Sequence, residues 1–194
     1  LTQARTDAER LATGELVYHG VVRTPLCVFA QSVPWRGQVF NVMNEFFANA
    51  ADLYRLTGEL NPEHDLYPAA DGGPKDLSGT RRRLMRMMGL DVGDCSEAEV
   101  LALAGQWRAA QVSQLAGQLN RVRHHHGLGD FAIVVSAGCG DFLVPSVVAS
   151  AGTNASAVQP YVQSVTHIQP QAASMAQVCA PCVAVALLYN GACH

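Results

Sequence analysis

The sequence predicts an α/β protein, and three observations support this prediction. The first part of the chain is rich in β-branched and aromatic residues, the middle has apolar residues at helical spacing, and Phe131 to Val135 form a continuous apolar run. Such a run is typical of a parallel strand that is buried on both faces. Because a glycine turn and a helical pattern come after it, we expect the second half to fold as β-α-β-α.

Composition narrows the class of protein. The chain has 194 residues, 49% apolar and only 15% charged, with a net charge of −3. This length predicts one domain, or two small ones, with a real hydrophobic core. The weakly acidic balance argues against a nucleic-acid binder, and no apolar run reaches the roughly 20 residues of a membrane span. Charged residues usually make up roughly 25% of a soluble domain. Because this chain has fewer, we expect that something outside the chain covers part of its surface.

The cysteines and the first residues predict the compartment. The six cysteines stand in a chain long enough to fold without disulfides, and the first residues lack the layout of a secretory signal. We therefore expect reduced thiols and a cytoplasmic location. Cys179 and Cys182 form a single CxxC motif, which indicates small buried residues on a helix more than a metal or redox site.

Short elements are expected in the first third of the chain. Thr6 to Glu9 has capping-box spacing and predicts a short helix that ends at Gly14. A helix with one apolar face is predicted over Asn44 to Leu56. Strands are predicted between them, at Leu16 to Val22, Cys27 to Ala30 and Gln38 to Val42.

A long loop and two helices are expected in the middle. Glu59 to Gly79 is rich in proline and glycine, and loops of this length are usually functional or mobile. A short basic helix is predicted from Thr80 to Met88. A second capping box, Ser96 to Glu99, opens a long helix that should end at Gly127.

The last third contains the predicted buried strand, a glycine turn and further short elements. The run from Phe131 leads into the turn Gly138-Cys139-Gly140, and a helix is expected from Asp141. A weaker strand is predicted near Ser164 to Ile168, and a final helix over about Cys179 to Leu188.

The glycine turn is the first candidate site. A turn between a strand and a helix lets backbone N–H groups, here near Gly138 and Gly140, approach an anion at the positive end of the helix. Asp141 comes immediately after the turn and would repel a phosphate there, so its carboxylate is better suited to a substrate ammonium or a metal. Ordinary turn formation is the competing interpretation.

The second candidate site lies in the loop before the basic helix. Asp71 and Asp76 can hold Mg²⁺ through its waters, while Lys75 and Arg81 can neutralise a diphosphate. The competing interpretation is a solvated basic helix behind a flexible loop. Elsewhere, Glu45 at the start of a predicted helix is a candidate general base, although a carboxylate in that place is often structural.

Several stretches together resemble a known family. Thr6 to Tyr18 and Gly20 to Pro25 are similar to a segment shared by tetrahydromethanopterin-linked one-carbon pathway proteins of the hydantoinase A/oxoprolinase group, with members in methanofuran biosynthesis. Nearly the whole chain shares this resemblance. Further matching stretches are Asn44 to Ala48, Ala51 to Arg55, Ala70 to Asp76, Arg83 to Leu84, Gly138 to Leu143 and Ala180 to Leu188.

The resemblance implies an actin-like, sugar-kinase-like ATPase fold of two ribonuclease-H-like lobes. The two phosphate loops of the first lobe are absent from this sequence, so we expect a chain that lacks most of that lobe. Residues 1–60 would form a β-rich segment and helix of the lobe junction, and 61–130 a loop and helical insertion. Residues 131–194 would form the second-lobe β-α-β-α unit with its ligand-loop turn.

By the same resemblance, we expect a transferase of methanofuran-type cofactor biosynthesis. It would join an activated aminomethyl-furan diphosphate to the phenol of a glutamyl-tyramine and release diphosphate. In that reaction Arg23 would join Lys75 and Arg81 at the diphosphate, beside Mg²⁺. Glu45 would deprotonate the phenol, and Asp141 would hold the substrate ammonium.

Two alternatives stay open at this point. One is an ATP-dependent amidohydrolase that acts on a cyclic amide, and tight binding of ATP with magnesium would favour it. The other is a non-catalytic lobe that binds a partner. The expected partners are a small-molecule substrate and either the missing N-terminal lobe or a second copy of the chain, with neither nucleic acid nor a membrane.

Overall fold

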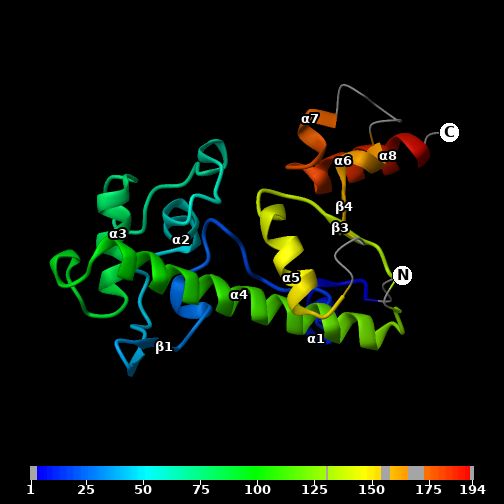
Figure 1. Ribbon diagram of the computed structural model, residues 1–194. Coiled ribbons are helices and arrows are strands. Elements are labelled where there is room, and N and C mark those ends of the chain that lie inside the picture. The colour runs from blue at the N-terminus through cyan, green and yellow to red at the C-terminus, as the bar shows by residue number, and fades with distance from the viewer. Residues whose placement is uncertain (1–3, 130, 154–157, 166–172, 193–194) are drawn as a thin grey trace.

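We describe the protein from a computed structural model, in which a single long helix organises the fold. Helix α4 (Glu97–His125) runs through the middle of the molecule (Figure 1). Against it pack α2 (Ala50–Leu56), α3 (Leu77–Arg86) and α5 (Val144–Ser150). The first helix, α1 (Asp7–Thr13), lies beside the C-terminal part of α4 and is held there by Arg121, which donates to the Ala12 carbonyl. The structure describes residues 4–129, 131–153, 158–165 and 173–192.

The last part of the chain adds small elements above α5. Helices α6 (Val162–Val165), α7 (Ala173–Ala176) and α8 (Ala180–Ala192) gather around the end of the chain (Figure 1). Neighbouring members of this group, α6 with α7 and α7 with α8, contact each other. Short 3₁₀ turns occur at Leu26–Val28, Pro62–His64, Val92–Asp94 and Asp141–Leu143.

The described strands form two small sheets. Strands β1 (Ser32–Trp35) and β2 (Gln38–Asn41) are antiparallel, with Ser32 opposite Asn41. Strands β3 (Val134–Ser136) and β4 (Val158–Pro160) are parallel, with Val134 opposite Val158. The mixture of helices and sheets agrees with the predicted α/β class in this coarse sense.

Capping signals predicted two helix starts correctly. The Thr6 side chain accepts from the Glu9 N–H while the Glu9 carboxylate accepts from the Thr6 N–H, and α1 ends at Gly14, whose φ is +82°. Ser96 and Glu99 form the same reciprocal pair at the start of α4. The predicted helix after Asp141 is also present, as a 3₁₀ turn that leads into α5 with proline in its first turn.

Replacing the cap of α4 should cost measurable stability. A Ser96→Ala variant loses the hydroxyl that accepts from the Glu99 N–H, and we expect the free energy of unfolding to fall by about 1 kcal/mol. Urea denaturation followed by circular dichroism measures this change. The matched control is Ser113→Ala, in an exposed position inside the same helix, which should leave stability unchanged or slightly raised.

Two of the predicted strands are wrong. The backbone from Leu16 to Val22 forms no strand, and Leu26–Val28 is a 3₁₀ turn. A β-rich segment becomes a strand only where another strand pairs with it. Here the Val22 carbonyl accepts instead from the N–H of Ala51 in the first turn of α2. The strand missed in this region is β1, whose proline is more typical of a turn.

Other element bounds also differ from the predictions. Helix α2 begins after Asn49 and not at Asn44, because the Asn49 side chain accepts from the Asp52 N–H and caps the helix there. Helix α3 begins before Thr80, because Asp76 caps it. Ser164 and Val165 are helical and not extended, while the rest of that predicted strand lies outside the described residues.

The strand predicted from Phe131 is shorter and more exposed than expected. Only Val134–Ser136 is extended and paired, and its neighbour is parallel as predicted. Phe131 is 91% exposed and Ile133 65% exposed. A continuous apolar run predicts burial on both faces when helices cover both faces of a wide sheet, but the sheet described here has two strands.

The hydrophobic core lies on the other side of the molecule, between α2, α3, the first half of α4 and the segment from Leu26 to Val42. Trp107, Tyr54 and Leu84 are fully buried there. Among the described residues, no helix combines the length and apolar character needed to cross a bilayer. The cysteines of the described residues are free thiols: Cys27, Cys95, Cys139, Cys179 and Cys182.

Candidate functional site

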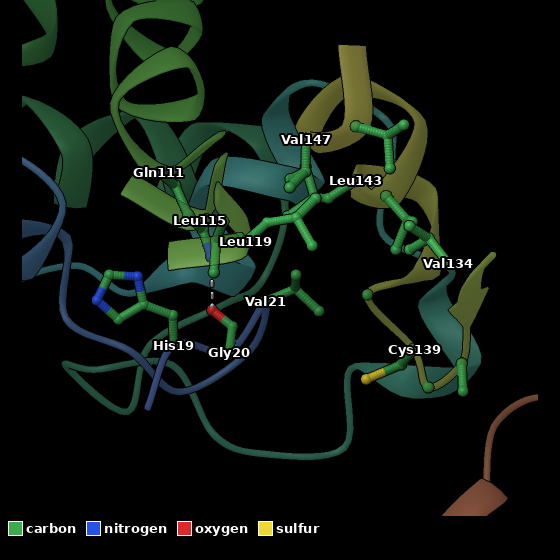
Figure 2. A pocket seen from close by; sticks show the side chains of 15 residues that line it. His19, Gly20, Val21, Gln111, Leu115, Leu119, Val134, Cys139, Leu143 and Val147 are labelled. Carbon is green, nitrogen blue, oxygen red and sulfur yellow. Dashed lines mark hydrogen bonds between the residues drawn. The ribbon is translucent and has the colours of Figure 1, made fainter. Parts of the chain in front are cut away.

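An apolar cavity lies where the second half of α4 meets the glycine turn. It encloses about 420 Å³ (Figure 2), a size that suits a small organic ligand. One wall is α4, the second is the segment His19 to Val21, and the third is the turn with α5. The lining residues are His19, Gly20, Val21, Gln111, Leu115, Leu119, Val134, Ala137, Gly138, Cys139, Gly140, Leu143, Val144, Val147 and Val148.

Glycine is required at the two ends of the turn for different structural reasons. Gly138 has a φ of +88°, which residues other than glycine rarely adopt. Its N–H donates to the Gln177 carbonyl at 2.6 Å. At Gly140, a Cβ atom would lie 3.0 Å from Cγ1 of Val21. Glycine therefore lets the turn approach the opposite wall closely, and any larger residue at 140 would push the two walls apart.

Buried polar groups hold the other walls in place. Gln111 is 1% exposed. Its Oε1 accepts from the Tyr54 hydroxyl at 2.5 Å, and its Nε2 donates to the Gly20 carbonyl at 3.4 Å. Burial lowers the pKa of His19, and its Nδ1 is buried without a hydrogen-bond partner among the described residues. The cavity wall thus holds a neutral imidazole at neutral pH.

A second hollow adjoins this cavity along the N-terminal segment. It encloses about 730 Å³ and is lined by the segment from Leu16 to Pro25, by Val28, and by His64 and Tyr67 of the loop before α3. The Arg23 guanidinium lies over the Tyr67 ring, 5.0 Å from its centroid. We call this hollow the Arg23 groove.

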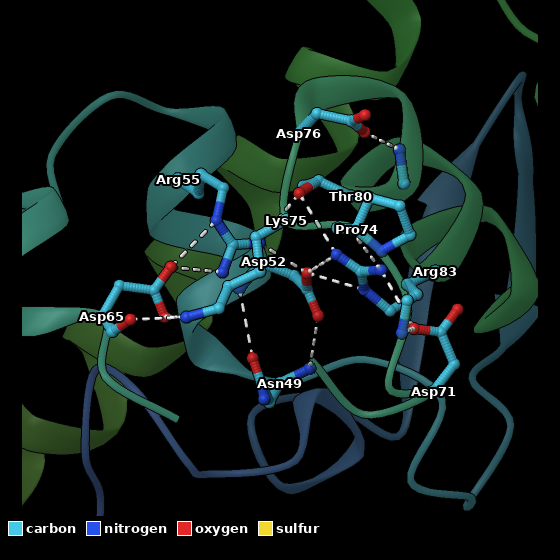
Figure 3. Close-up of polar contacts among 12 residues, drawn as sticks. Asn49, Asp52, Arg55, Asp65, Asp71, Pro74, Lys75, Asp76, Thr80 and Arg83 are labelled. Atoms are coloured by element: carbon cyan, nitrogen blue, oxygen red, sulfur yellow. Dashed lines mark hydrogen bonds and ion pairs between the residues drawn. The ribbon is translucent and has the colours of Figure 1, made fainter. Parts of the chain in front are cut away.

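A network of ion pairs lies beside these hollows, between α2, α3 and the loop that joins them (Figure 3). Asp52 and Arg83 are both fully buried and pair at 2.8 Å. Arg55 joins Asp52 at 2.8 Å to Asp65 at 2.6 Å. Lys75 also pairs with Asp65, at 3.2 Å.

Asp71 belongs to the edge of this network. Its carboxylate accepts from Arg83 at 3.1 Å and from the Gly73 N–H at 2.9 Å. Burial alone would raise the pKa of Asp71, but the Gly73 N–H and the Arg83 guanidinium outweigh burial and lower it. Asp71 is therefore ionised at neutral pH and ties the loop to α3.

The predicted site residues fall into separate places. Gly138 and Gly140 line the apolar cavity, and Arg23 lines the groove that adjoins it. Asp141 comes directly after the turn, and its carboxylate accepts from Nε2 of Gln177 at 2.9 Å. Glu45 is exposed in the loop between β2 and α2, and it lines neither hollow.

The residues predicted to bind diphosphate and magnesium have partners within the protein. Lys75 and Asp71 belong to the ion network. Asp76 caps α3, where its carboxylate accepts from the Gly79 N–H at 2.6 Å, and Arg81 pairs with Glu97. In the described ranges, no three histidine, cysteine, aspartate or glutamate side chains converge as metal ligands.

Four other residues that shape the hollows were not singled out from the sequence. His19 and Gln111 in the cavity, with Tyr67 and His64 in the groove, come from segments far apart in the chain. Gln111 carried one usable signal, since it is a polar residue on the buried face of the predicted long helix. A buried glutamine must find hydrogen-bond partners, and so it often joins segments.

Fold and site together define an α/β protein with an apolar cavity and a glycine turn in the cavity wall. Over 129 residues, 66% of this chain, it is 26% identical to the (4-{4-[2-(gamma-L-glutamylamino)ethyl]phenoxymethyl}furan-2-yl)methanamine synthase of Methanocaldococcus jannaschii. It is 25% identical over 129 residues to the synthase of the same name from Methanococcus vannielii. These similarities confirm the predicted resemblance to synthases of methanofuran biosynthesis, over 66% of this chain.

The similarity is partial in length. The matched region covers 39% of the first synthase and 58% of the second, so the chain spans less than two thirds of either relative. No family model matches the chain.

Proposed function

We propose that this chain acts in the synthesis of a methanofuran-type cofactor, as a transferase that forms the ether between a phenol and a furan methylene. The observation that carries this proposal is the similarity to the two synthases, whose names describe a phenoxymethyl-furan product. The cavity at the glycine turn supports it, because its size and apolar lining suit one aromatic ring. We extend the proposal to the actin-like fold implied by the sequence resemblance.

The proposed step balances as a displacement. The phenol oxygen forms a bond to the furan methylene carbon, and the bond from that carbon to the diphosphate oxygen breaks with its electron pair on diphosphate. The phenol proton goes to a carboxylate, for which Glu45 is the candidate from the sequence, although Glu45 lines neither hollow. Asp141, directly after the cavity wall, is the candidate partner of the substrate ammonium.

The proposal places cations at the leaving diphosphate. Lys75 and Arg81 are candidates together with Arg23, although the first two already pair with Asp65 and Glu97. Asp71 and Asp76 do not form a metal cage by themselves, and Mg²⁺ commonly binds through one or two carboxylates plus substrate phosphates. We therefore propose that Mg²⁺ is held only together with diphosphate.

Product formation tests this function directly. The protein is incubated with glutamyl-tyramine, the aminomethyl-furan diphosphate and magnesium, without ATP, and ether product and free diphosphate are measured. We expect equal amounts of both. The control acceptor lacks the phenol hydroxyl and should give neither. Absence of ether with the intact acceptor would contradict the proposal.

A further inference from the structure

We propose that the Arg23 groove holds the anionic end of a ligand whose ring lies in the apolar cavity beside the glycine turn. This inference rests on the proposed function only in taking these hollows as the substrate site. It assigns Arg23 as the anion-binding residue and the loop with His64 and Tyr67 as the wall that positions it.

The two hollows adjoin each other. His19, Gly20, Val21 and Cys139 line both of them. A ligand that reaches past these shared residues would place one end in each hollow. The apolar cavity has no charged lysine, arginine, aspartate or glutamate in its lining, so a charged group is better placed in the groove than in the cavity.

The charge of the groove favours an anion. No aspartate or glutamate lines it, whereas Arg23 does, in a chain whose net charge is −3. Arginines elsewhere pair with carboxylates, namely Arg36, Arg55, Arg81, Arg83 and Arg108. The Arg23 guanidinium instead lies over the Tyr67 ring, 5.0 Å from its centroid. A guanidinium presents a planar fork of five N–H donors, which matches a planar or tetrahedral anion.

Ion pairs hold the loop that forms the His64 and Tyr67 wall of the groove. Asp65 lies between His64 and Tyr67 in the chain, and its carboxylate is held by Arg55 and Lys75. Because these ion pairs tie the loop to α2 and to the turn before α3, the Tyr67 ring is kept under the Arg23 guanidinium. Lys75 thereby acts on the groove through Asp65, as a positioning residue.

Binding of simple probes tests the inference without turnover. Phenyl phosphate, phenol and inorganic phosphate are titrated separately into the protein and followed by ligand-observed NMR. We expect phenyl phosphate to bind more tightly than either other probe. In an Arg23→Gln variant its dissociation constant should rise about tenfold or more, because a charge-assisted hydrogen bond is lost. The matched control is Arg82→Gln, an exposed arginine on α3 outside both hollows, which should bind phenyl phosphate unchanged.

A second variant tests the ring position. Ala137 is exposed at the rim of the apolar cavity, so Ala137→Phe should fill the cavity without unfolding the protein. We expect it to weaken phenyl phosphate and phenol together and to leave inorganic phosphate unchanged. Unchanged phenyl phosphate binding in either Arg23→Gln or Ala137→Phe would overturn the inference. Loss of ether synthesis alone would not, because the function then fails while the binding site stands.

Discussion

Replacing Arg83 by methionine is expected to lower the free energy of unfolding by about 3–5 kcal/mol, because a buried charge then lacks its main partner. The Arg83 and Asp52 side chains are fully buried and pair at 2.8 Å. Without Arg83, the Asp52 carboxylate keeps Arg55 but loses the guanidinium that reaches it from α3. Asp71 and the Pro74 carbonyl lose a donor at the same time. Urea denaturation of the variant and the unchanged protein measures the difference.

The neighbouring arginine provides the control. Arg82→Met changes the same residue type one position earlier, at an exposed site, and should change stability by no more than about 0.5 kcal/mol. If both variants unfold at the same urea concentration, the buried pair contributes no more to the free energy of unfolding than an exposed arginine does. A double variant, Asp52→Leu with Arg83→Met, should recover part of the loss, because replacing both members of a buried pair removes the unpaired charge.

The ion network could be predicted only in part from the sequence. Asp71 and Lys75 are recognisable as charged residues of a functional-looking loop, and the loop itself is present. The buried pair at the centre of the network was not predictable, since Asp52 and Arg83 are 31 positions apart and meet only after α2 and α3 pack together. Diphosphate and metal binding were expected at Lys75 and Asp71, and in the structure the same side chains form ion pairs that hold the loop.

Local signals were reliable, and long-range ones were not. The capping pairs at Thr6 and Ser96 determine the starts of α1 and α4, because both partners lie within one helical turn. The segment from Leu16 to Val22 has strand composition without a strand partner, so its backbone became a cavity wall. The glycine turn is recognisable as a candidate site, but its cavity joins α4, the turn and this segment, which the sequence does not place together.

Trp107 is the second position where one substitution should have a large effect. It is fully buried on α4 among side chains of the core cluster, and the periodicity of the long helix predicts it on the apolar side. Trp107→Ala should lower the free energy of unfolding by about 3–5 kcal/mol, because a large cavity is left in the core. Thermal and urea unfolding of the variant measure the loss.

Trp107→Phe separates packing from polarity at this site. The Nε1 of Trp107 is buried and has no hydrogen-bond partner among the described residues, so removing that N–H should sacrifice no bond, and phenylalanine should cost clearly less than alanine. Equal losses in the two variants would contradict the expectation that the retained aromatic ring preserves most of the packing. Gln111 lies one helical turn further along α4 and ties it to the cavity wall at Gly20. The alanine variant should therefore also weaken phenol binding, since a loosened α4 no longer holds that wall in place.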